Sequence, residues 1–351
     1  MPPPAEEGAP AAPVAYTRYE EQLYFMSDAL QAYFDNPTVR GELMTKLHEA
    51  RVEVRSLIDR QTVGWRPVFE VLLWPPVKGA AVSSSAAVGR TVASGWCQDV
   101  YAPFQQDIAG YYPFNPSGHD LPFEALTTFY KPSGGLLTTF TREVLGDSVR
   151  KEGQRYSFSR QLGADRGSLF KKSLLQFLER ASDLSEAFFP ARSEEPRIDL
   201  EVLIHPSPLV HTTALVIGGR SVDYHNGPER WHPLTWPGSD PHAGAFIQVR
   251  GANGMHERVN QDGVWGLYRL IEAGTVTRTS ATVFSVAWQL RTHDVIVRMD
   301  FRPKRAESPF FPRAGSGRTL SFLSPVRERA GHPPAQILKS GTPCSAGTSA
   351  P

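Results

Sequence analysis

The sequence predicts an α+β protein, with an N-terminal all-α helical domain followed by a C-terminal β-sandwich domain. Apolar residues recur every three or four positions from Tyr19 to Leu184, which is the period of amphipathic helices. Beyond Pro190 the period becomes two, beginning with the apolar residues Ile198, Leu200, Val202 and Ile204. We therefore predict a disordered linker at residues 1–15, an α-helical domain at 16–190, a β-sandwich domain at 191–312 and a loosely ordered Pro/Gly/Ser-rich tail at 313–351.

The first two predicted helices form a hairpin. Apolar residues between Tyr19 and Tyr33 define the first helix, which the segment Asp35-Asn36-Pro37 ends. A second apolar face runs from Leu43 to Leu57. A break this short predicts that the two helices pack antiparallel.

Besides a short helix near Asp120, three further helices are expected in the helical domain. A short apolar helix starts at Pro67 and ends at the pair Pro75-Pro76. The last helix is expected at residues 168–189. Between them, another helix presents an apolar face made of Val92, Trp96, Val100 and Phe104.

The stretch from Tyr111 to Phe140 is dense in aromatic residues and in prolines and glycines. Asp120 stands where an N-cap is expected, with Pro122 in the first turn of a short helix. Pro132, Gly134 and Gly135 end that helix. The stretch has no nucleophile beside a base, so we interpret it as a packing joint between helices.

The C-terminal half reads as about eight strands separated by turn residues. Leu215 and Ile217 lie on one arm of a hairpin whose turn is Gly218-Gly219, and Val222 and Tyr224 lie on the returning arm. Such a run of short strands predicts a β-sandwich, here with one short helical insertion at residues 264–274.

The composition excludes several classes of protein. Lys+Arg 37 against Asp+Glu 36 leaves a net charge of +1, which gives no electrostatic footprint for nucleic acid or an anionic membrane surface. No run approaches 18 apolar residues, so no membrane span is expected, and the first residues do not form a signal peptide. The two cysteines, Cys97 and Cys344, are too few for a disulfide framework or a metal site, although an oxidising compartment is permitted.

No catalytic or metal-binding pattern stands out, and we predict no cofactor. The histidines of the β half lack ligand spacing on one element. Ser168 and Lys171 fit S-x-x-K, but the companion motifs are missing and both residues start an amphipathic helix. Arg269, in an otherwise apolar helix, needs a carboxylate partner that the sequence does not name.

A carbohydrate- or peptidoglycan-binding module, or a cell-wall enzyme, is the competing class. Tryptophan faces on a sandwich could stack on sugars, although Trp265 and Trp288 fit core positions better. The four tryptophans of the β half are Trp231, Trp236, Trp265 and Trp288.

Several motifs resemble the C-terminal extracytoplasmic region of the IcmF (TssM) family, the large inner-membrane component of type VI secretion. The resemblance covers about 200 residues clearly, although this chain has a Pro-rich tail where family members usually end. The matching residues, which this resemblance predicts to be structural positions of the family motifs, are Tyr112, Pro113, Phe114, Asp120, Gly134, Tyr224, Gly227, Pro228, Trp236, Trp265, Leu267, Arg269, Pro309 and Phe310.

The resemblance implies a non-enzymatic, periplasmic scaffold whose membrane segments lie upstream of this chain. Its implied partners are an outer-membrane lipoprotein of the TssJ type, a TssL-type inner-membrane partner and further copies of itself. The implied mechanism is mechanical bridging of two membranes. We expect the lipoprotein to contact the hairpin and loops of the sandwich, with candidate residues Gly218, Gly219, Arg220, Asn226, Asn253, Met255 and Asp262.

Overall fold

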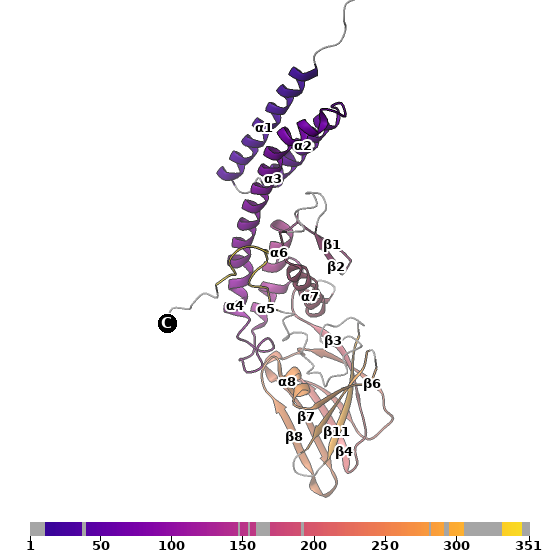
Figure 1. Cartoon of the computed structure of the whole chain (residues 1–351). Coiled ribbons are helices and arrows are strands. Elements are labelled where there is room, and N and C mark those ends of the chain that lie inside the picture. The colour runs from indigo at the N-terminus through magenta and orange to yellow at the C-terminus, as the bar shows by residue number, and fades with distance from the viewer. Residues whose placement is uncertain are drawn as a thin grey trace, which may run out of the picture. The chain divides into compact units, whose positions relative to one another are not determined.

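The structure, a computed structural model, describes residues 11–36, 40–146, 148–153, 155–158, 169–190, 193–280, 282–290, 295–304 and 332–345. Its contacts group into two units (Figure 1). The N-terminal unit comprises Met1–Ser94, Phe158–Phe170 and Leu338–Gly341, and the C-terminal unit comprises Gly95–Ser157, Lys171–Ile337 and Thr342–Pro351. The helix-to-strand change predicted near residue 190 therefore lies inside the C-terminal unit.

Helices α1 (Ala11–Asp35) and α2 (Arg40–Asp59) of the N-terminal unit form the expected antiparallel hairpin. Arg18, early in α1, forms an ion pair of 3.8 Å with Glu53, late in α2. The apolar faces of the two helices meet. The described buried side chains are Tyr19, Met26, Ala29, Ala50, Val54, Leu57 and Ile58. The helical period in the sequence located this hairpin correctly.

Helix α3 (Arg66–Trp96) contradicts one prediction, because it continues through Pro75 and Pro76 instead of ending there. The two prolines remove hydrogen bonds to the carbonyl groups of Val71 and Leu72. Val71 and Leu72 are 71% and 65% exposed, so water can satisfy the freed carbonyl groups. Val77 is fully buried immediately beyond the prolines, and this packing favours continuation of the helix.

The C-terminal unit begins with a π-helical turn (Cys97–Tyr101) and the helices α4 (Ala102–Asp107), α5 (Phe123–Tyr130), α6 (Leu136–Glu143) and α7 (Lys172–Phe188). The last helix thus starts four residues later than predicted, and Ser168 lies outside the described residues. Strands β1 (Val149–Glu152) and β2 (Arg155–Phe158) pair in a stretch predicted to be wholly helical. The aromatic core here includes Trp96, whose indole lies 5.6 Å from Phe140 and 5.7 Å from Phe177 between ring centroids.

The sandwich consists of two antiparallel sheets. The five-stranded sheet has the order β6-β3-β11-β10-β9, and the four-stranded sheet has the order β5-β4-β7-β8. The strands are β3 (Ile198–Ile204), β4 (Val210–Ile217), β5 (Arg220–Tyr224), β6 (Trp231–Trp236), β7 (Ala245–Gly251), β8 (His256–Gln261), β9 (Thr275–Arg278), β10 (Phe284–Gln289) and β11 (Ile296–Pro303). The sequence indicated all of these except β9, and it placed the β4–β5 turn at Gly218-Gly219 correctly.

Alternation along the strands builds the core of the sandwich. In β3 the side chains of Ile198, Leu200, Val202 and Ile204 are buried, while the residues between them are half-exposed. Helix α8 (Gly266–Glu272) is the predicted helical insertion, and Leu267, Leu270 and Ile271 bury its apolar face.

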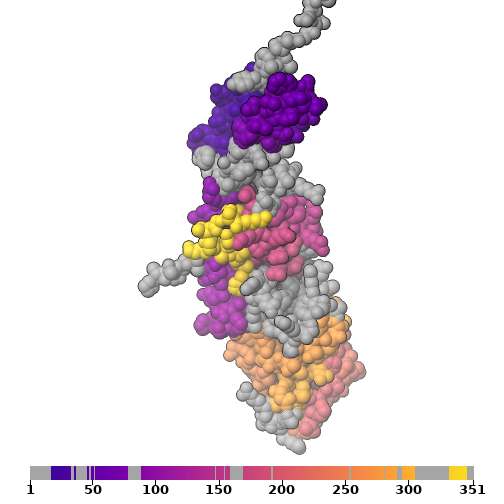
Figure 2. Space-filling view, in the orientation of Figure 1, coloured from indigo at the N-terminus to yellow at the C-terminus, as the bar shows by residue number. Residues whose placement is uncertain are grey.

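Residues 332–345 are the described part of the predicted tail, and residues 313–331 and 346–351 lie outside the described residues. The segment is yellow in Figure 2, and its residues 332–337 and 342–345 belong to the C-terminal unit. A disulfide joins Cys97 to Cys344, and the indole nitrogen of Trp96 donates to the carbonyl oxygen of Pro334 at 2.9 Å. Each cysteine is isolated in sequence, 247 positions from its partner, so no spacing pattern indicated this bond.

Candidate functional site

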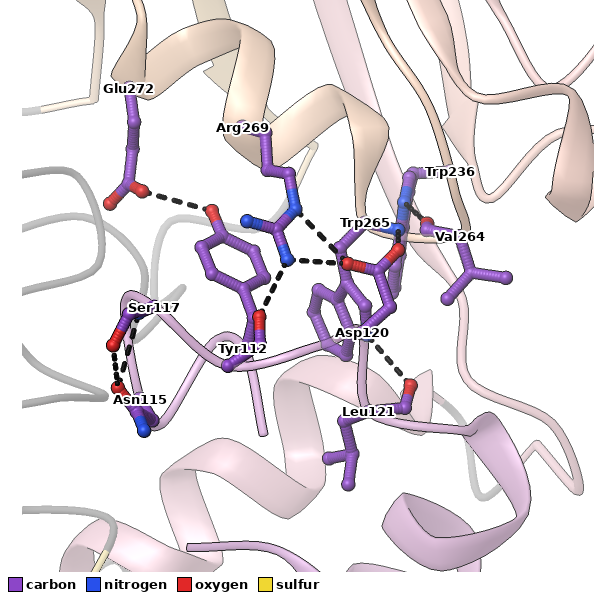
Figure 3. Close-up of polar contacts among 11 residues, drawn as sticks. Tyr112, Asn115, Ser117, Asp120, Leu121, Trp236, Val264, Trp265, Arg269 and Glu272 are labelled. Carbon is purple, nitrogen blue, oxygen red and sulfur yellow. Dashed lines mark hydrogen bonds and ion pairs between the residues drawn. The ribbon is translucent and has the colours of Figure 1, made fainter. Parts of the chain in front are cut away.

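The loop before α5 meets the sandwich through an ion pair between Asp120 and Arg269 (Figure 3). Oδ1 of Asp120 accepts hydrogen bonds from Nη2 and Nε of Arg269, at 2.7 and 3.0 Å. Nη2 also donates to the carbonyl oxygen of Gly118 at 3.1 Å. The side chains of Asp120 and Arg269 are only 22% and 26% exposed, so this pair is stronger than a fully solvated one.

This arrangement corrects the prediction that Asp120 caps a helix. The N-cap position of α5 is Pro122, and no side chain caps it. Asp120 lies two residues earlier, and its second oxygen, Oδ2, instead accepts from the backbone N–H of Trp265 at 3.2 Å. The carboxylate that Arg269 was predicted to need is therefore Asp120, 149 positions away in the chain.

Tyr112 holds the other side of Arg269. Its ring lies under the guanidinium group, with 3.9 Å between the guanidinium carbon and the ring centroid. The Tyr112 hydroxyl donates to a carboxylate oxygen of Glu272 at 3.0 Å. Arg269 thus lies between a carboxylate and an aromatic face, both contributed by the loop of residues 112–121 (Figure 3).

Below this polar contact, two tryptophans form the centre of an aromatic cluster. The ring centroids of Trp236 and Trp265 are 4.9 Å apart, and both side chains are buried. The indole N–H of Trp265 donates to the carbonyl oxygen of Leu121 at 2.8 Å. The indole N–H of Trp236 donates to the carbonyl oxygen of Val264 at 3.0 Å. Tyr268 packs 5.0 Å from Trp236, and burial raises the pKa of its hydroxyl well above 10.0.

Position 263, two residues before Trp265, has room only for a glycine. Its φ is +85°, and a Cβ atom would lie 2.1 Å from Oδ2 of Asp120. We name the contact formed by Tyr112, Asp120, Gly263, Trp265 and Arg269 the junction. It joins the helices of the C-terminal unit to the sandwich without any catalytic arrangement.

The other family-motif residues that the structure describes also have structural surroundings. Phe114 is buried and stacks on Tyr130 at 6.0 Å between centroids, after the cis peptide bond that precedes Pro113. The Tyr224 hydroxyl donates to the carbonyl oxygen of Gly227 at 2.8 Å, next to the exposed Pro228. Leu267 is buried, and Gly134 has a φ of +95° between α5 and α6. Pro309 and Phe310 lie outside the described residues.

The predicted partner-binding residues do not form one surface, because the registers place them at opposite ends of the four-stranded sheet. Gly218, Gly219 and Arg220 form the β4–β5 turn, and Asp262 follows β8 at that same end, next to the junction. Gly218 itself is buried, and its carbonyl oxygen accepts the backbone N–H groups of Ser239 and Asp240, each at 2.9 Å.

Asn226, Asn253 and Met255 lie at the other end, which we name the distal loops (residues 205–209, 225–230 and 252–255). The side-chain amide of Asn226 donates to the carbonyl oxygen of Val210 at 2.7 Å. The backbone N–H of Ala252 donates to the carbonyl oxygen of Leu209 at 3.0 Å. Met255 is buried; of Asn253, only the backbone position between β7 and β8 is described.

Leu209 is the residue of the distal loops that sequence reasoning missed. It is 64% exposed and has a φ of +65°, an uncommon conformation for a branched apolar residue. Ile296, at the start of β11, is 49% exposed at the same end, and its carbonyl oxygen accepts from the Ser207 hydroxyl at 2.7 Å.

An ionic cluster holds two of these loops together. Nδ1 of His205 lies 2.9 Å from Glu229, and Nε2 lies 3.1 Å from Asp300. Burial lowers the pKa of His205. The hydrogen bonds to Glu229 and Asp300 and their negative charges raise it by more than burial lowers it, so the pKa lies above 6.5. The protonated imidazole therefore ties the loop before β4 to the loop before β6.

The geometry offers little to the competing function classes. Trp236, Trp265 and Trp288 are buried, and the half-exposed Trp231 is covered by the guanidinium group of Arg302 at 4.2 Å. Within the described part of the chain, no group of three or more His, Cys, Asp or Glu residues could hold a metal ion. A pocket of about 290 Å³ near α4 and α5 has Asp107 and Glu124 in an otherwise largely apolar wall, and its lining includes no histidine, serine, cysteine or basic residue.

Comparison with known proteins identifies the family. The model of the type VI secretion protein IcmF helical domain matches residues 87–193, and that of the IcmF C2-like domain matches residues 200–303. The chain belongs to the IcmF/TssM family. It is similar to the type VI secretion system component TssM1 of Pseudomonas aeruginosa, with 22% identity over 90% of this chain and 28% of that protein. It therefore represents a C-terminal region and spans under a third of that relative's length.

Solved structures share the fold of this IcmF/TssM region. A chain of a type VI secretion system membrane core complex matches with a TM-score of 0.71 and 18% identity, over 84% of this chain and 58% of that chain. The C-terminal domain of the T6SS protein TssM from EAEC matches with a TM-score of 0.58 and 20% identity, over 72% of this chain and all of that one. Helices followed by antiparallel sheets are thus the fold that this region shares with those structures. Among the described residues, no helix is long and apolar enough to cross a membrane.

Proposed function

We propose that this chain is the periplasmic part of a type VI secretion scaffold, which binds an outer-membrane lipoprotein of the TssJ type and bridges the inner and outer membranes. In this proposal it also contacts a TssL-type inner-membrane partner and further copies of itself. Its work is mechanical and not enzymatic. The observation that carries the proposal is the junction, since a bridge between membranes must transmit force from helices to sandwich without unfolding.

The construction of the junction supports this role. Two hydrogen bonds from Arg269 to Oδ1 of Asp120 cross from the sandwich to the helices, and so does the indole hydrogen bond of Trp265. The surrounding aromatic rings exclude water, which strengthens these polar contacts. Two elements joined in this way move together when either one is pulled.

The distal loops are the proposed lipoprotein site. They lie at the end of the sandwich opposite the junction. Force on a partner bound there would therefore pass through the sandwich to the junction and the helices. Leu209 and Ile296 expose apolar side chains at that end, and the ion pairs of His205 fix the loop backbone in advance of binding. Exposed apolar residues on prearranged loops are typical of interface anchors.

The disulfide supports the periplasmic location. Disulfides persist in the bacterial periplasm and are rare in the reducing cytosol. The bond between Cys97 and Cys344 holds residues 332–345 on the helices, so it contributes to the fold. A scaffold that matures in the periplasm would form this bond as it folds.

Calorimetric titration of the full chain with the lipoprotein encoded in the same secretion cluster tests the proposal. We expect saturable one-to-one binding, weakened by about tenfold or more in Leu209→Glu, because the substitution removes an apolar contact and would bury a charge. Val52→Glu, at a similarly exposed valine of α2, is the matched control and should bind like the wild type.

Two results would contradict this assignment. If Leu209→Glu binds as tightly as Val52→Glu, the lipoprotein does not contact the distal loops. If the folded wild-type chain ignores the lipoprotein but is retained on peptidoglycan, the carbohydrate-binding class is favoured instead.

A further inference from the structure

The outer face of the four-stranded sheet carries a cluster of basic side chains on the neighbouring strands β7 and β8 (Figure 1). These side chains are Arg250, His256 and Arg258, all exposed, and we name them the cationic face. Arg250 lies directly opposite His256 in the ladder. Arg258 lies opposite Gln248, two residues from Arg250 along β7. The buried Val249 alternates with these positions, so the cationic face points away from the core.

No carboxylate that the structure describes pairs with the two guanidinium groups of the cationic face. Nη2 of Arg258 donates to the side-chain oxygen of Asn260 at 3.0 Å. Gln248, with its amide oxygen turned toward the cations, accepts from Nε2 of His256 at 3.0 Å and from Nε and Nη2 of Arg250, each at 3.2 Å. Both acceptors are neutral, so the positive charges are not compensated within the face.

The ordinary roles of surface charge do not account for this arrangement. Edge strands often carry charged side chains that prevent pairing with other chains, and β8 is an edge strand. Arg250, however, lies on β7, which is paired on both sides by β4 and β8. Among the described strands of this sheet, the outward carboxylate is Asp223 on β5, beyond β4, where the Ser221 hydroxyl donates to it at 2.9 Å. The two arginines are therefore available to an external anion.

Arg258 is fixed in position before any partner binds. Its guanidinium carbon lies 3.5 Å from the ring centroid of Phe246, on the same face of the sheet. A guanidinium group stacked in this way keeps N–H groups at its edge for an incoming acceptor. Because the side chain is already ordered, binding costs less conformational entropy than it would for a free arginine.

The chemistry of the face favours carboxylates as its ligands. The planar guanidinium group of arginine matches the two oxygens of a carboxylate. A lipid surface fits less well, because the clusters that bind anionic lipids contain about four to eight Lys or Arg residues, and the described part of this face has two. Nucleic acid is disfavoured by the net charge of +1.

The spacing of the two arginines indicates an extended polypeptide. Arg250 and Arg258 are diagonal neighbours on adjacent strands, so their Cβ atoms are about 7 Å apart. In an extended chain, alternate side chains point to the same side and are also about 7 Å apart. Beside β7, the residues of β4 are the short and uncharged Thr212, Ala214 and Val216, which leave the arginines accessible from that side.

We propose that the cationic face binds an extended acidic segment of a partner protein, with Asp or Glu at alternate positions. One carboxylate of the segment pairs with Arg250 and the next pairs with Arg258. The inference goes beyond the proposed scaffold function. The cationic face lies on strands and not in the distal loops, so its failure leaves the lipoprotein site unaffected.

Fluorescence anisotropy of a labelled eight-residue peptide that alternates glutamate with serine, titrated with the full chain at low ionic strength, tests the proposal. We expect saturable binding that weakens as salt is added, since the contacts are exposed ion pairs. Arg250→Gln and Arg258→Gln should each weaken binding about threefold to fivefold, and the double variant about tenfold or more. Arg298→Gln, at an exposed arginine on β11 of the other sheet, is the matched control and should bind like the wild type.

A second peptide tests the spacing. It has the same composition, but its four glutamates stand at positions 1, 2, 5 and 6, so that no two of them alternate. It should bind about threefold more weakly than the alternating peptide, because only one of its carboxylates at a time can meet the two arginines. Equal affinity for the two peptides would overturn the assignment to an extended alternating segment.

Other results would reject the surface itself. A folded wild-type chain that ignores the alternating peptide at low ionic strength overturns the proposal, and so does a double variant that binds it normally. Binding to phosphatidylglycerol vesicles that the double variant loses, without binding of the peptide, would assign the face to lipid instead. Melting curves verify that each variant is folded.

Discussion

At the scale of single residues, the pairing of Asp120 with Arg269 is the contact on which the junction depends. The sequence indicated that Arg269 required a carboxylate, because a guanidinium group on an apolar helix is costly when unpaired. It did not identify the partner, since nothing local marks a residue 149 positions away. The local pattern favours a helix cap for Asp120 instead, because an aspartate shortly before a proline is typical of the start of a helix. A distant ion-pair partner leaves no such local pattern.

Replacing Asp120 with Asn should destabilise the fold by about 2 kcal/mol. The substitution removes the charge from a partly buried pair and leaves Arg269 without a counter-ion. Glu143→Gln is the control, because the pair of Arg142 and Glu143 is 63% and 60% exposed and should contribute less than about 0.5 kcal/mol. Urea unfolding gives the free energy of unfolding of both variants. Equal values would show that the pair of Asp120 and Arg269 stabilises the fold no more than the exposed pair does.

Gly263→Ala tests the close approach of Asp120 to the backbone. We expect a loss of about 3 kcal/mol, since the new methyl group would displace the carboxylate and the backbone φ is +85°. Gly254→Ala separates the two causes: its φ is +75°, but nothing lies within 4 Å of the position that its new methyl group would take, so only about 1 kcal/mol of backbone strain is expected. If thermal unfolding gives both variants the same loss, the steric argument for Gly263 is wrong.

At the scale of elements, periodicity located nearly every helix and strand, and the failures have physical causes. The Pro75-Pro76 pair was predicted to end a helix, yet α3 continues through it at a point where Val71 and Leu72, whose carbonyl groups lose their helical partners, are exposed. Strand β9 is only four residues long, too short for an alternating pattern to register. The packed segment at 332–345 depends on a disulfide between two isolated cysteines, which no local pattern can announce.

Removing this disulfide with Cys344→Ser should release residues 332–345 and lower stability by about 2–5 kcal/mol, because the bond closes a long loop. Differential scanning calorimetry of the variant, and of the wild type with and without reductant, measures the effect. Thiol titration of the unreduced, unfolded wild type should find no free cysteine. Free thiols there, or a melting temperature that ignores reductant, would contradict the account.

The distal loops should respond to pH through His205. Its pKa is raised in the folded state, so the stabilisation is fully present below pH 6.5 and is lost as the pH rises through the raised value. Hydrogen exchange of residues 226–230, corrected for intrinsic rates, should therefore accelerate across that window. His205→Gln should remove the dependence, and the turn at residues 218–220 should not share it. Exchange that slows with rising pH would contradict the assigned ion pairs.

At the scale of the whole molecule, the sequence was informative about class and less so about surfaces. The change from helical to strand period predicted an α+β fold, and the motifs in their order along the chain predicted the IcmF/TssM family. Both predictions are confirmed. Partner-facing residues were harder, because loops adjacent in sequence can lie at opposite ends of a sheet. Gly218 and Asn226 are eight positions apart, yet the β5 strand between them carries Asn226 to the far end of the sandwich.

The distal loops are the proposed lipoprotein site, and the junction lies at the other end of the sandwich. Hydrogen-exchange mass spectrometry of the full chain, with and without the cluster's lipoprotein, tests whether the lipoprotein binds there. We predict added protection at residues 205–210, 225–230 and 252–255, with the junction loop at residues 112–121 unchanged. Protection confined to the helices or to residues 218–220 and 262, or none at a saturating concentration, would contradict it.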